Sequence, residues 1–154
     1  MVLMAYECEA KIRLRFERID EIVDHWREAA PGKRAAIDFG GRERDWFAFS
    51  GLVGIAEREL REAHVGAGHR VALIIENCVA AAAFFFACSR IGAWAVPINA
   101  RLTAEEVKGI LDHCRPQLIV ATAAASADAR AHGKALGAVG AAHWRWDELA
   151  IAMP

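Results

Sequence analysis

The sequence predicts an α/β fold: an open, mostly parallel sheet with helices on both faces. Two nearly continuous apolar runs, residues 70–75 and 94–98, are rich in branched side chains and are typical of strands covered on both faces, as in parallel sheets. A helical pattern lies between them, and another separates them from a third apolar run, residues 118–121. Strand, helix, strand, helix, strand with short connections predicts two consecutive right-handed βαβ units.

The composition favours one cytoplasmic domain. A chain of 154 residues fits a single compact core. Charged residues make up 25% of it, the net charge is −1 and the two signs are interleaved, so neither nucleic acid nor an anionic membrane is an expected partner. The apolar stretch of residues 79–88 is far shorter than the roughly 20 residues of a membrane span. Charged residues also interrupt the N-terminus before an apolar run reaches signal-peptide length.

The first part of the chain predicts a lead-in, a helix and a hairpin. Residues 1–18 alternate irregularly between charged and apolar side chains, and we expect weak or edge structure there. From Ile19 the apolar residues have helical spacing, and Pro31 with the following glycine ends the helix. Residues 33–39 and 42–47 then predict two strands joined by a tight Gly-Gly turn.

Two helices follow, each with a candidate cap. Ser50 is the expected N-cap of a helix that Gly66 and Gly68 end. Its inward face comprises Leu52, Val53, Ala56, Leu60 and Ala63. Asn77 is the expected cap of the helix over residues 79–91, which is apolar on every side and must therefore lie between layers.

The remaining elements are predicted from a capping box, a proline and weaker patterns. Thr103 followed by Glu106 is a capping box that opens a helix, and Pro116 prevents its continuation. Beyond the third strand, the Ala-rich residues 123–136 predict a helix. We also expect a further strand over residues 141–146 and a final short helix capped by the next residue, Asp147.

Several common sites are excluded by spacing. Gly66-Ala67-Gly68 follows a helix and opens a strand, whereas the dinucleotide fingerprint requires the reverse order. No GxxxxGK[ST] and no GxSxG occurs, which excludes a P-loop and the simplest serine hydrolase. The histidines show no HxxxH or HExxH spacing, and we expect packing to explain most tryptophans. We expect reduced thiols at the four cysteines, with Cys88 acting as a small hydrophobe: Cys8, Cys78, Cys88 and Cys114.

Arg101 is the one residue that we select as a candidate binding residue. It follows the strand predicted over residues 94–98, and ligands of open parallel sheets gather at the carboxyl ends of the strands. A guanidinium there can hold a phosphate with two parallel hydrogen bonds. The alternative is an ordinary surface ion pair with Glu105, four residues further on.

Residues 90–106, RIGAWAVPINARLTAEE, resemble the N-terminal region of the adenylate-forming superfamily, particularly its acyl-CoA synthetases. Members carry R-x-G-A, two variable residues, V-P-x-N and then P-R-L-T-x-E-E; Ala100 here replaces the usual proline. The preceding G-x-G-x-R-V-A-L-I-I-E-N, which ends at Asn77, is similar to the family's G-D-R-V-A-L-x-x-x-N. Upstream, Ala48 and Gly51 depart from the family's T-Y-x-E-L motif.

The resemblance implies a large two-part ligase that activates a carboxylic acid with ATP and Mg²⁺ as an acyl-adenylate, then transfers the acyl group to coenzyme A (CoA). It also implies that the phosphate loop with its lysine, the ribose-binding aspartate and the catalytic lysine come later than residue 154. Arg101 matches a family arginine near the entrance taken by the nucleotide end of CoA. We therefore predict no catalytic residue and no metal ligand in this chain.

The combined prediction is a lead-in of residues 1–18 and an N-terminal α/β subdomain of residues 19–154, truncated before the phosphate loop. The parent would be an AMP-forming acid–thiol ligase acting on a small carboxylic acid. We expect the chain alone to be inactive and to hold no cofactor tightly, because one charged hydrogen bond contributes about 1.5–3 kcal/mol and micromolar binding requires about 8 kcal/mol. Apolar surface that the remainder would cover predicts self-association.

Two alternatives use the same strands and helices. The first is a stand-alone, non-catalytic module that uses this scaffold to bind another chain. The second is an unrelated flavodoxin-like α/β domain, in which the motif similarity is coincidence. Against the second stands the lack of Gly/Ser/Thr-rich loops at the strand ends.

Overall fold

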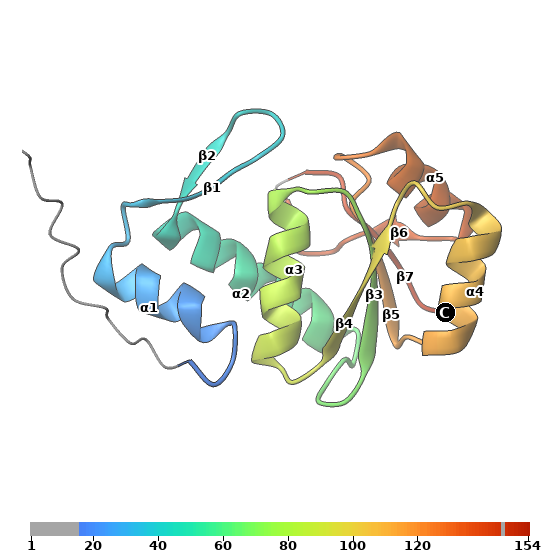
Figure 1. Ribbon diagram of the computed structural model, residues 1–154, viewed down its shortest axis with the longest axis horizontal. Coiled ribbons are helices and arrows are strands. Elements are labelled where there is room, and N and C mark those ends of the chain that lie inside the picture. The colour runs from blue at the N-terminus through green and yellow to red at the C-terminus, as the bar shows by residue number, and fades with distance from the viewer. Residues whose placement is uncertain (1–15, 146) are drawn as a thin grey trace, which may run out of the picture.

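A five-stranded sheet forms the centre of the molecule in the computed structural model, which describes residues 16–145 and 147–154 (Figure 1). The predicted lead-in, residues 1–18, lies almost wholly outside these residues. The strand order is β4 (Trp94–Asn99), β3 (Arg70–Ile75), β5 (Leu118–Ala121), β7 (Ala150–Ala152) and β6 (Val139–Gly140). Only β7 runs antiparallel to its neighbours, so four strands of the sheet share one direction and the predicted, mostly parallel sheet is confirmed.

Helices cover both faces of this sheet, as predicted. On one face lie α2 (Trp46–Glu62) and α3 (Val79–Arg90); on the other lie α4 (Ala104–Cys114) and α5 (Ala127–Ala135) (Figure 1). Side chains alternate between the two faces along a strand. Accordingly, Val71 and Leu73 of β3 pack in the core with α2 and α3, while Ala72 and Ile74 pack in the core with α4 and α5.

The predicted helix and hairpin are both present, and they lie to one side of the central sheet (Figure 1). They are α1 (Glu21–Ala29) and the antiparallel pair β1 (Arg34–Ile37) and β2 (Glu43–Asp45). The rings of Trp26 on α1 and Trp46 on α2 stack with their centroids 6.2 Å apart, which joins this part to the main core. Packing therefore explains these two tryptophans.

Two predicted helix caps are wrong by a few residues. Helix α2 begins at Trp46, because β2 ends early and the Asp45 carboxylate accepts a hydrogen bond from Ala48 N at 2.7 Å. Ser50 is instead buried inside the helix. Helix α3 is capped by the Cys78 sulfur, which accepts from Ala81 N at 3.4 Å, and not by Asn77.

The C-terminal quarter differs most from the prediction. Helix α5 is shorter than residues 123–136, because Ser126 caps it at Ala129 N. Residues 141–145 form no strand, and a strand, β7, stands where a helix capped by Asp147 was expected. The physical reason is that the Glu59 carboxylate on α2 accepts from His143 N and from Trp144 N, at 2.7 Å for the latter, so these donors cannot join a strand ladder.

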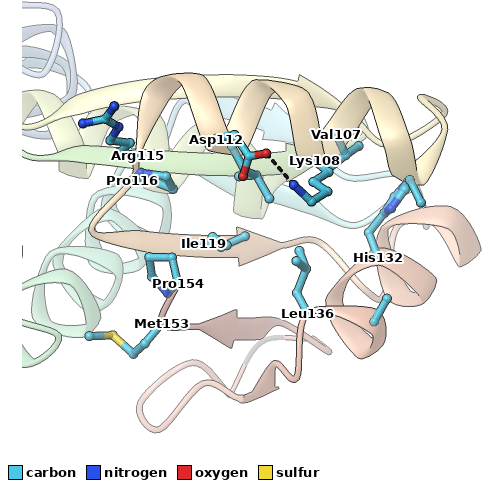
Figure 2. Close-up of a pocket in the computed structure, with 13 residues that line it drawn as sticks. Val107, Lys108, Asp112, Arg115, Pro116, Ile119, His132, Leu136, Met153 and Pro154 are labelled. Carbon is cyan, nitrogen blue, oxygen red and sulfur yellow. Dashed lines mark hydrogen bonds and ion pairs between the residues drawn. The ribbon is translucent and has the colours of Figure 1, made fainter.

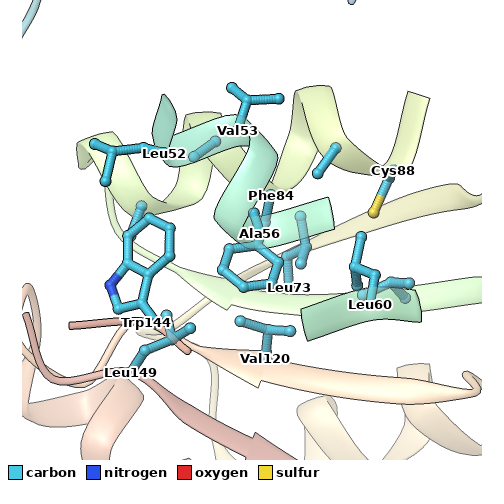
Figure 3. Packing of buried hydrophobic residues seen from close by; sticks show 14 of the residues in the cluster. Leu52, Val53, Ala56, Leu60, Leu73, Phe84, Cys88, Val120, Trp144 and Leu149 are labelled. Atoms are coloured by element: carbon cyan, nitrogen blue, oxygen red, sulfur yellow. The ribbon is translucent and has the colours of Figure 1, made fainter. Parts of the chain in front are cut away.

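The loop of residues 141–145 places the Trp144 side chain in the core. Trp144 is 3% exposed, and its ring centroid lies 5.5 Å from that of Phe84 on α3. Figure 3 shows the two rings between Leu52 on α2 and Val120 on β5. The buried Glu59 thus determines where a large hydrophobic side chain sits.

Cys88 lies in the same core and confirms the prediction of a small hydrophobe. Burial raises the pKa of its thiol to about 12, so the thiol remains protonated at neutral pH. Cys78, Cys88 and Cys114 are all free thiols, and Cys8 lies outside the described residues.

We expect Glu59→Ala to lower the free energy of unfolding by about 1–3 kcal/mol, because it leaves buried backbone donors without their acceptor. The matched control is Glu62→Ala, one turn along the same helix, whose carboxylate makes an exposed ion pair with His143 and whose loss should cost less than about 1 kcal/mol. Urea unfolding followed by tryptophan fluorescence measures both. Equal losses in the two variants would contradict a positioning role for Glu59.

Candidate functional site

The carboxyl ends of β3, β4 and β5 meet at one edge of the sheet, because these strands are parallel. Ligands of open α/β sheets bind at this edge. Polar side chains follow each strand there: Glu76 after β3, Arg101 shortly after β4 and Thr122 after β5. A cavity of about 280 Å³ opens beside them and is lined by Ile75, Glu76, Asn77, Pro97, Ile98 and Asn99. We treat this edge as the candidate binding site.

The Arg101 side chain reaches across this edge to the neighbouring strand. Its Nε donates to Glu76 Oε1 at 2.8 Å. The alternative of an ordinary surface ion pair is thus confirmed in kind, but Glu105 is the wrong partner, because the partner lies 25 residues earlier in the chain. The Arg101 side chain is 74% exposed and that of Glu76 is 25% exposed. Such an exposed pair contributes at most about 1 kcal/mol. A guanidinium has five N–H donors and this bond uses one, so an incoming phosphate can compete with Glu76.

The backbone that carries Arg101 is held by side chains and strands. Arg101 N donates to Asn99 Oδ1 at 2.9 Å, and Ala100 N donates to Ile75 O at 3.2 Å, which continues the pairing of β4 with β3. The Glu76 backbone is held similarly, since its N–H donates to the buried Thr122 hydroxyl at 3.3 Å. Glu76, Asn99 and Thr122 were not selected from the sequence, although each ends or directly follows a predicted strand.

The predicted capping box closes the other end of the turn. Thr103 Oγ1 accepts from Glu106 N at 3.3 Å, and the Glu106 carboxylate accepts from Thr103 N at 2.8 Å. The hydrogen bonds that Thr103 N and the Thr103 hydroxyl donate to this carboxylate lower the pKa of Glu106. Helix α4 is thereby joined to the Arg101 turn by a fixed first turn.

A second polar cluster lies at the N-terminus of α3. Asp38 is 4% exposed, and its carboxylate accepts from Val79 N at 3.4 Å and from Arg42 Nη2 at 3.1 Å. Trp144 Nε1 donates to Asp147 Oδ1 at 2.7 Å. Burial raises the pKa of Cys78, and the negative charges of Asp147 and Asp38 raise it further. A thiol in this environment remains protonated and is a poor nucleophile.

Neither a metal centre nor a membrane span is found in the part of the chain that the structure describes. Across residues 16–145 and 147–154, no three His, Cys, Asp or Glu side chains lie together as a metal site requires. No helix within those same ranges is long and apolar enough to cross a membrane.

The profile of one protein family, described as AMP-binding enzyme, matches residues 23–150. The chain belongs to this family. The match spans the hairpin, both βαβ units and the polar edge described above. It removes the flavodoxin-like alternative and confirms the resemblance found in the sequence.

Relatives of this chain include several CoA ligases. It is 32% identical to indoleacetate–CoA ligase of Aromatoleum aromaticum over 101 residues, which cover 66% of this chain and 20% of the relative. It is 48% identical to crotonobetaine/carnitine–CoA ligase of Citrobacter koseri over 56 residues, or 36% of this chain and 11% of the relative. The chain therefore spans a fifth or less of these two relatives.

Solved structures give the same result for the fold. The inhibitor-bound N-terminal domain of FACL13 from Mycobacterium tuberculosis aligns with a TM-score of 0.65 and 26% identity, over 68% of this chain and 26% of that one. The anthranilate CoA ligase AuaEII in complex with anthranoyl-AMP aligns with a TM-score of 0.61 and 25% identity, over 66% of this chain and 19% of that one. The α/β fold is thus that of the N-terminal region of acyl-CoA synthetases.

Because its pKa is raised in the folded state, Asp147 destabilises the protein at neutral pH, and this destabilisation is lost as the pH falls. Burial raises its pKa, as does the charge of Asp38, while the hydrogen bond from Trp144 opposes the shift. The folded state therefore binds the proton more tightly than the unfolded chain. The cost of the Asp147 charge to stability is complete above its raised pKa, and it disappears as the pH falls toward the ordinary value of 3.8.

We therefore expect Asp147→Asn, which keeps an oxygen acceptor for Trp144, to raise the urea midpoint at pH 7. This gain should shrink as the pH falls through the raised pKa, which urea titrations at pH 7, 6, 5 and 4 will measure. Asp112→Asn, on an exposed ion pair with Lys108, is the matched control and should show no such gain. A gain that stays constant with pH would contradict the assignment.

Proposed function

We propose that this chain is the N-terminal segment of an ATP-dependent acyl-CoA ligase, which activates a carboxylic acid as an acyl-adenylate and then transfers the acyl group to the CoA thiol. The match of the AMP-binding family over residues 23–150 carries the proposal. The names of the relatives support it, since they include an indoleacetate–CoA ligase and a crotonobetaine/carnitine–CoA ligase. In this proposal residues 19–154 are one subdomain, which ends before the phosphate loop, and the enzyme works in the cytoplasm.

The proposal assigns the chemistry to later parts of the enzyme. ATP, Mg²⁺ and the carboxylic acid belong to the whole protein, and the chain alone is inactive and binds none of them tightly. For CoA, Arg101 supplies one charged hydrogen bond at an open edge, worth about 1.5–3 kcal/mol, whereas micromolar binding requires roughly 8 kcal/mol.

The DNA beyond the codon for Pro154 tests this proposal directly. An open frame that continues into a Ser/Thr/Gly-rich loop ending in lysine supports the ligase, and acid-dependent exchange of pyrophosphate with ATP should then appear in the full product and not in the 154-residue chain. A stop codon at that point contradicts it and favours the alternative of a stand-alone interaction module.

A large apolar groove favours contact of the isolated chain with another protein, either a different partner, as in the stand-alone interaction module, or a second copy of this chain. The groove lies between α4 and α5, encloses about 840 Å³ and is rimmed by Lys108 and Arg115 (Figure 2). Its apolar lining includes Val107, Leu111, Ile119, Leu136 and Met153. Open apolar surface of this kind promotes association.

We expect sedimentation velocity to show self-association of the chain as its concentration rises. Leu136→Lys, which puts a charge into the groove, should weaken association, because a charge is costly to bury. Trp94→Lys, which adds the same charge on the exposed edge strand β4 outside the groove, is the control and should weaken association less than Leu136→Lys. A wild-type chain that remains monomeric at high concentration would contradict the prediction.

Arg101 takes the role of a contact for the nucleotide end of CoA in this proposal. In the full-length enzyme, Arg101→Ala should raise the KM for CoA by about ten- to a hundredfold, the loss of one charge-assisted hydrogen bond, with adenylate formation nearly unchanged. Arg115→Ala, at the opposite edge of the sheet, is the matched control. Equal losses in both half-reactions would instead indicate a structural role for Arg101.

A further inference from the structure

His132 makes two contacts that the proposed function does not use. It lies on α5, and its Nε2 is 3.1 Å from Ala100 O and 3.0 Å from Leu102 O. These two carbonyls flank Arg101 in the chain. Figure 2 shows His132 beside the first turns of α4, the helix that follows this turn. One ring nitrogen thus spans the backbone on both sides of the candidate CoA contact.

The chemistry of the two partners determines the proton on this nitrogen. Carbonyl oxygens only accept hydrogen bonds, so Nε2 must carry a hydrogen that it shares between Ala100 O and Leu102 O. The peptide that joins Ala100 to Arg101 is then held at both ends. Its N–H donates to Asn99 Oδ1 at 2.9 Å, and its C=O accepts from His132.

Close packing of α5 on the sheet brings the imidazole within reach. Gly133 follows His132, and a Cβ at that position would lie 3.3 Å from the Cβ of Ala150 on β7 and 3.4 Å from that of Ala121 on β5. The first distance is tighter than most real Cβ contacts and the second is a close van der Waals contact, so the glycine favours a close approach of α5 to both strands. A side chain from the middle of α5 can therefore reach the loop after β4, on the far side of β3.

We infer that His132 is a positioning residue for Arg101: it fixes the Ala100–Leu102 turn so that the guanidinium faces the carboxyl edge of the sheet, where it receives a phosphate. The choice of the phosphate of CoA as ligand rests on the proposed function; the positioning rests on the hydrogen bonds. His132 orders the backbone of the turn and not the Arg101 side chain, whose ion pair with Glu76 is exposed.

Nuclear magnetic resonance of the ¹⁵N-labelled 154-residue chain tests the positioning without any activity. A long-range ¹H–¹⁵N spectrum of the neutral ring should show the hydrogen of His132 on Nε2. His132→Phe, which keeps a flat ring and removes the donor, should shift the amide and Nε signals of Arg101 and speed hydrogen exchange at that amide by about three- to tenfold.

Two further variants separate positioning from general destabilisation. His132→Gln keeps an N–H donor and should restore most of the wild-type Arg101 signals. His113→Phe, at an exposed position of α4, should leave them unchanged. A hydrogen on Nδ1 alone, or wild-type Arg101 signals in folded His132→Phe, would overturn the inference.

Titration with CoA up to roughly 100 mM, the range that one contact of about 1.5–3 kcal/mol requires, then tests the ligand. We expect shifts at residues 99–103 of the wild-type chain and a dissociation constant about three- to tenfold higher in His132→Phe. Equal affinities would overturn the link between positioning and binding. Absence of CoA shifts in the wild type would overturn the proposed CoA contact, while altered Arg101 signals in His132→Phe would still support the positioning role.

Discussion

The double burial of β3 is the constraint on which the rest of the structure depends. Its four inner residues, Val71 to Ile74, are 0% exposed and alternate between two cores, so helices must cover both faces. Parallel partners on both sides, β4 and β5, require a crossover helix for each return of the chain. Those crossovers place the ends of three strands at one edge. The position of Arg101 beside Glu76 is therefore a consequence of burying β3.

Elements with strong local signals were predictable from the sequence. Continuous apolar runs identified β3, β4 and β5, and the capping box identified the first turn of α4. Caps that depend on a neighbouring element were not. Both Asp45 and Ser50 are good cap residues, and only the length of β2 decides between them. Strand β7 has three residues without periodicity, and its pairing with β5 comes from a partner about 30 residues away in the chain.

The candidate site was predictable in part for the same reason. The position of Arg101 follows from the rule that ligands gather at strand ends, and its resemblance to a family arginine agrees with that rule. Its partner does not follow, because helical spacing suggested Glu105 while the neighbouring strand supplies Glu76. His132 is still less accessible to sequence analysis. Nothing in an Ala-rich stretch indicates that one imidazole reaches two carbonyls some 30 residues earlier.

The Arg101 edge combines a fixed backbone with a loosely held side chain, and this combination suits the binding of an anion. A buried, fully paired guanidinium would have to break strong interactions before it could meet a phosphate. The exposed pair with Glu76 costs little to exchange. The turn itself is ordered in advance by Asn99, by the strand pairing of Ala100 and by His132, so binding need not order it. Binding an anion therefore requires only the Arg101 side chain to change its partner, while the strands and α5 already hold the backbone of the turn in place.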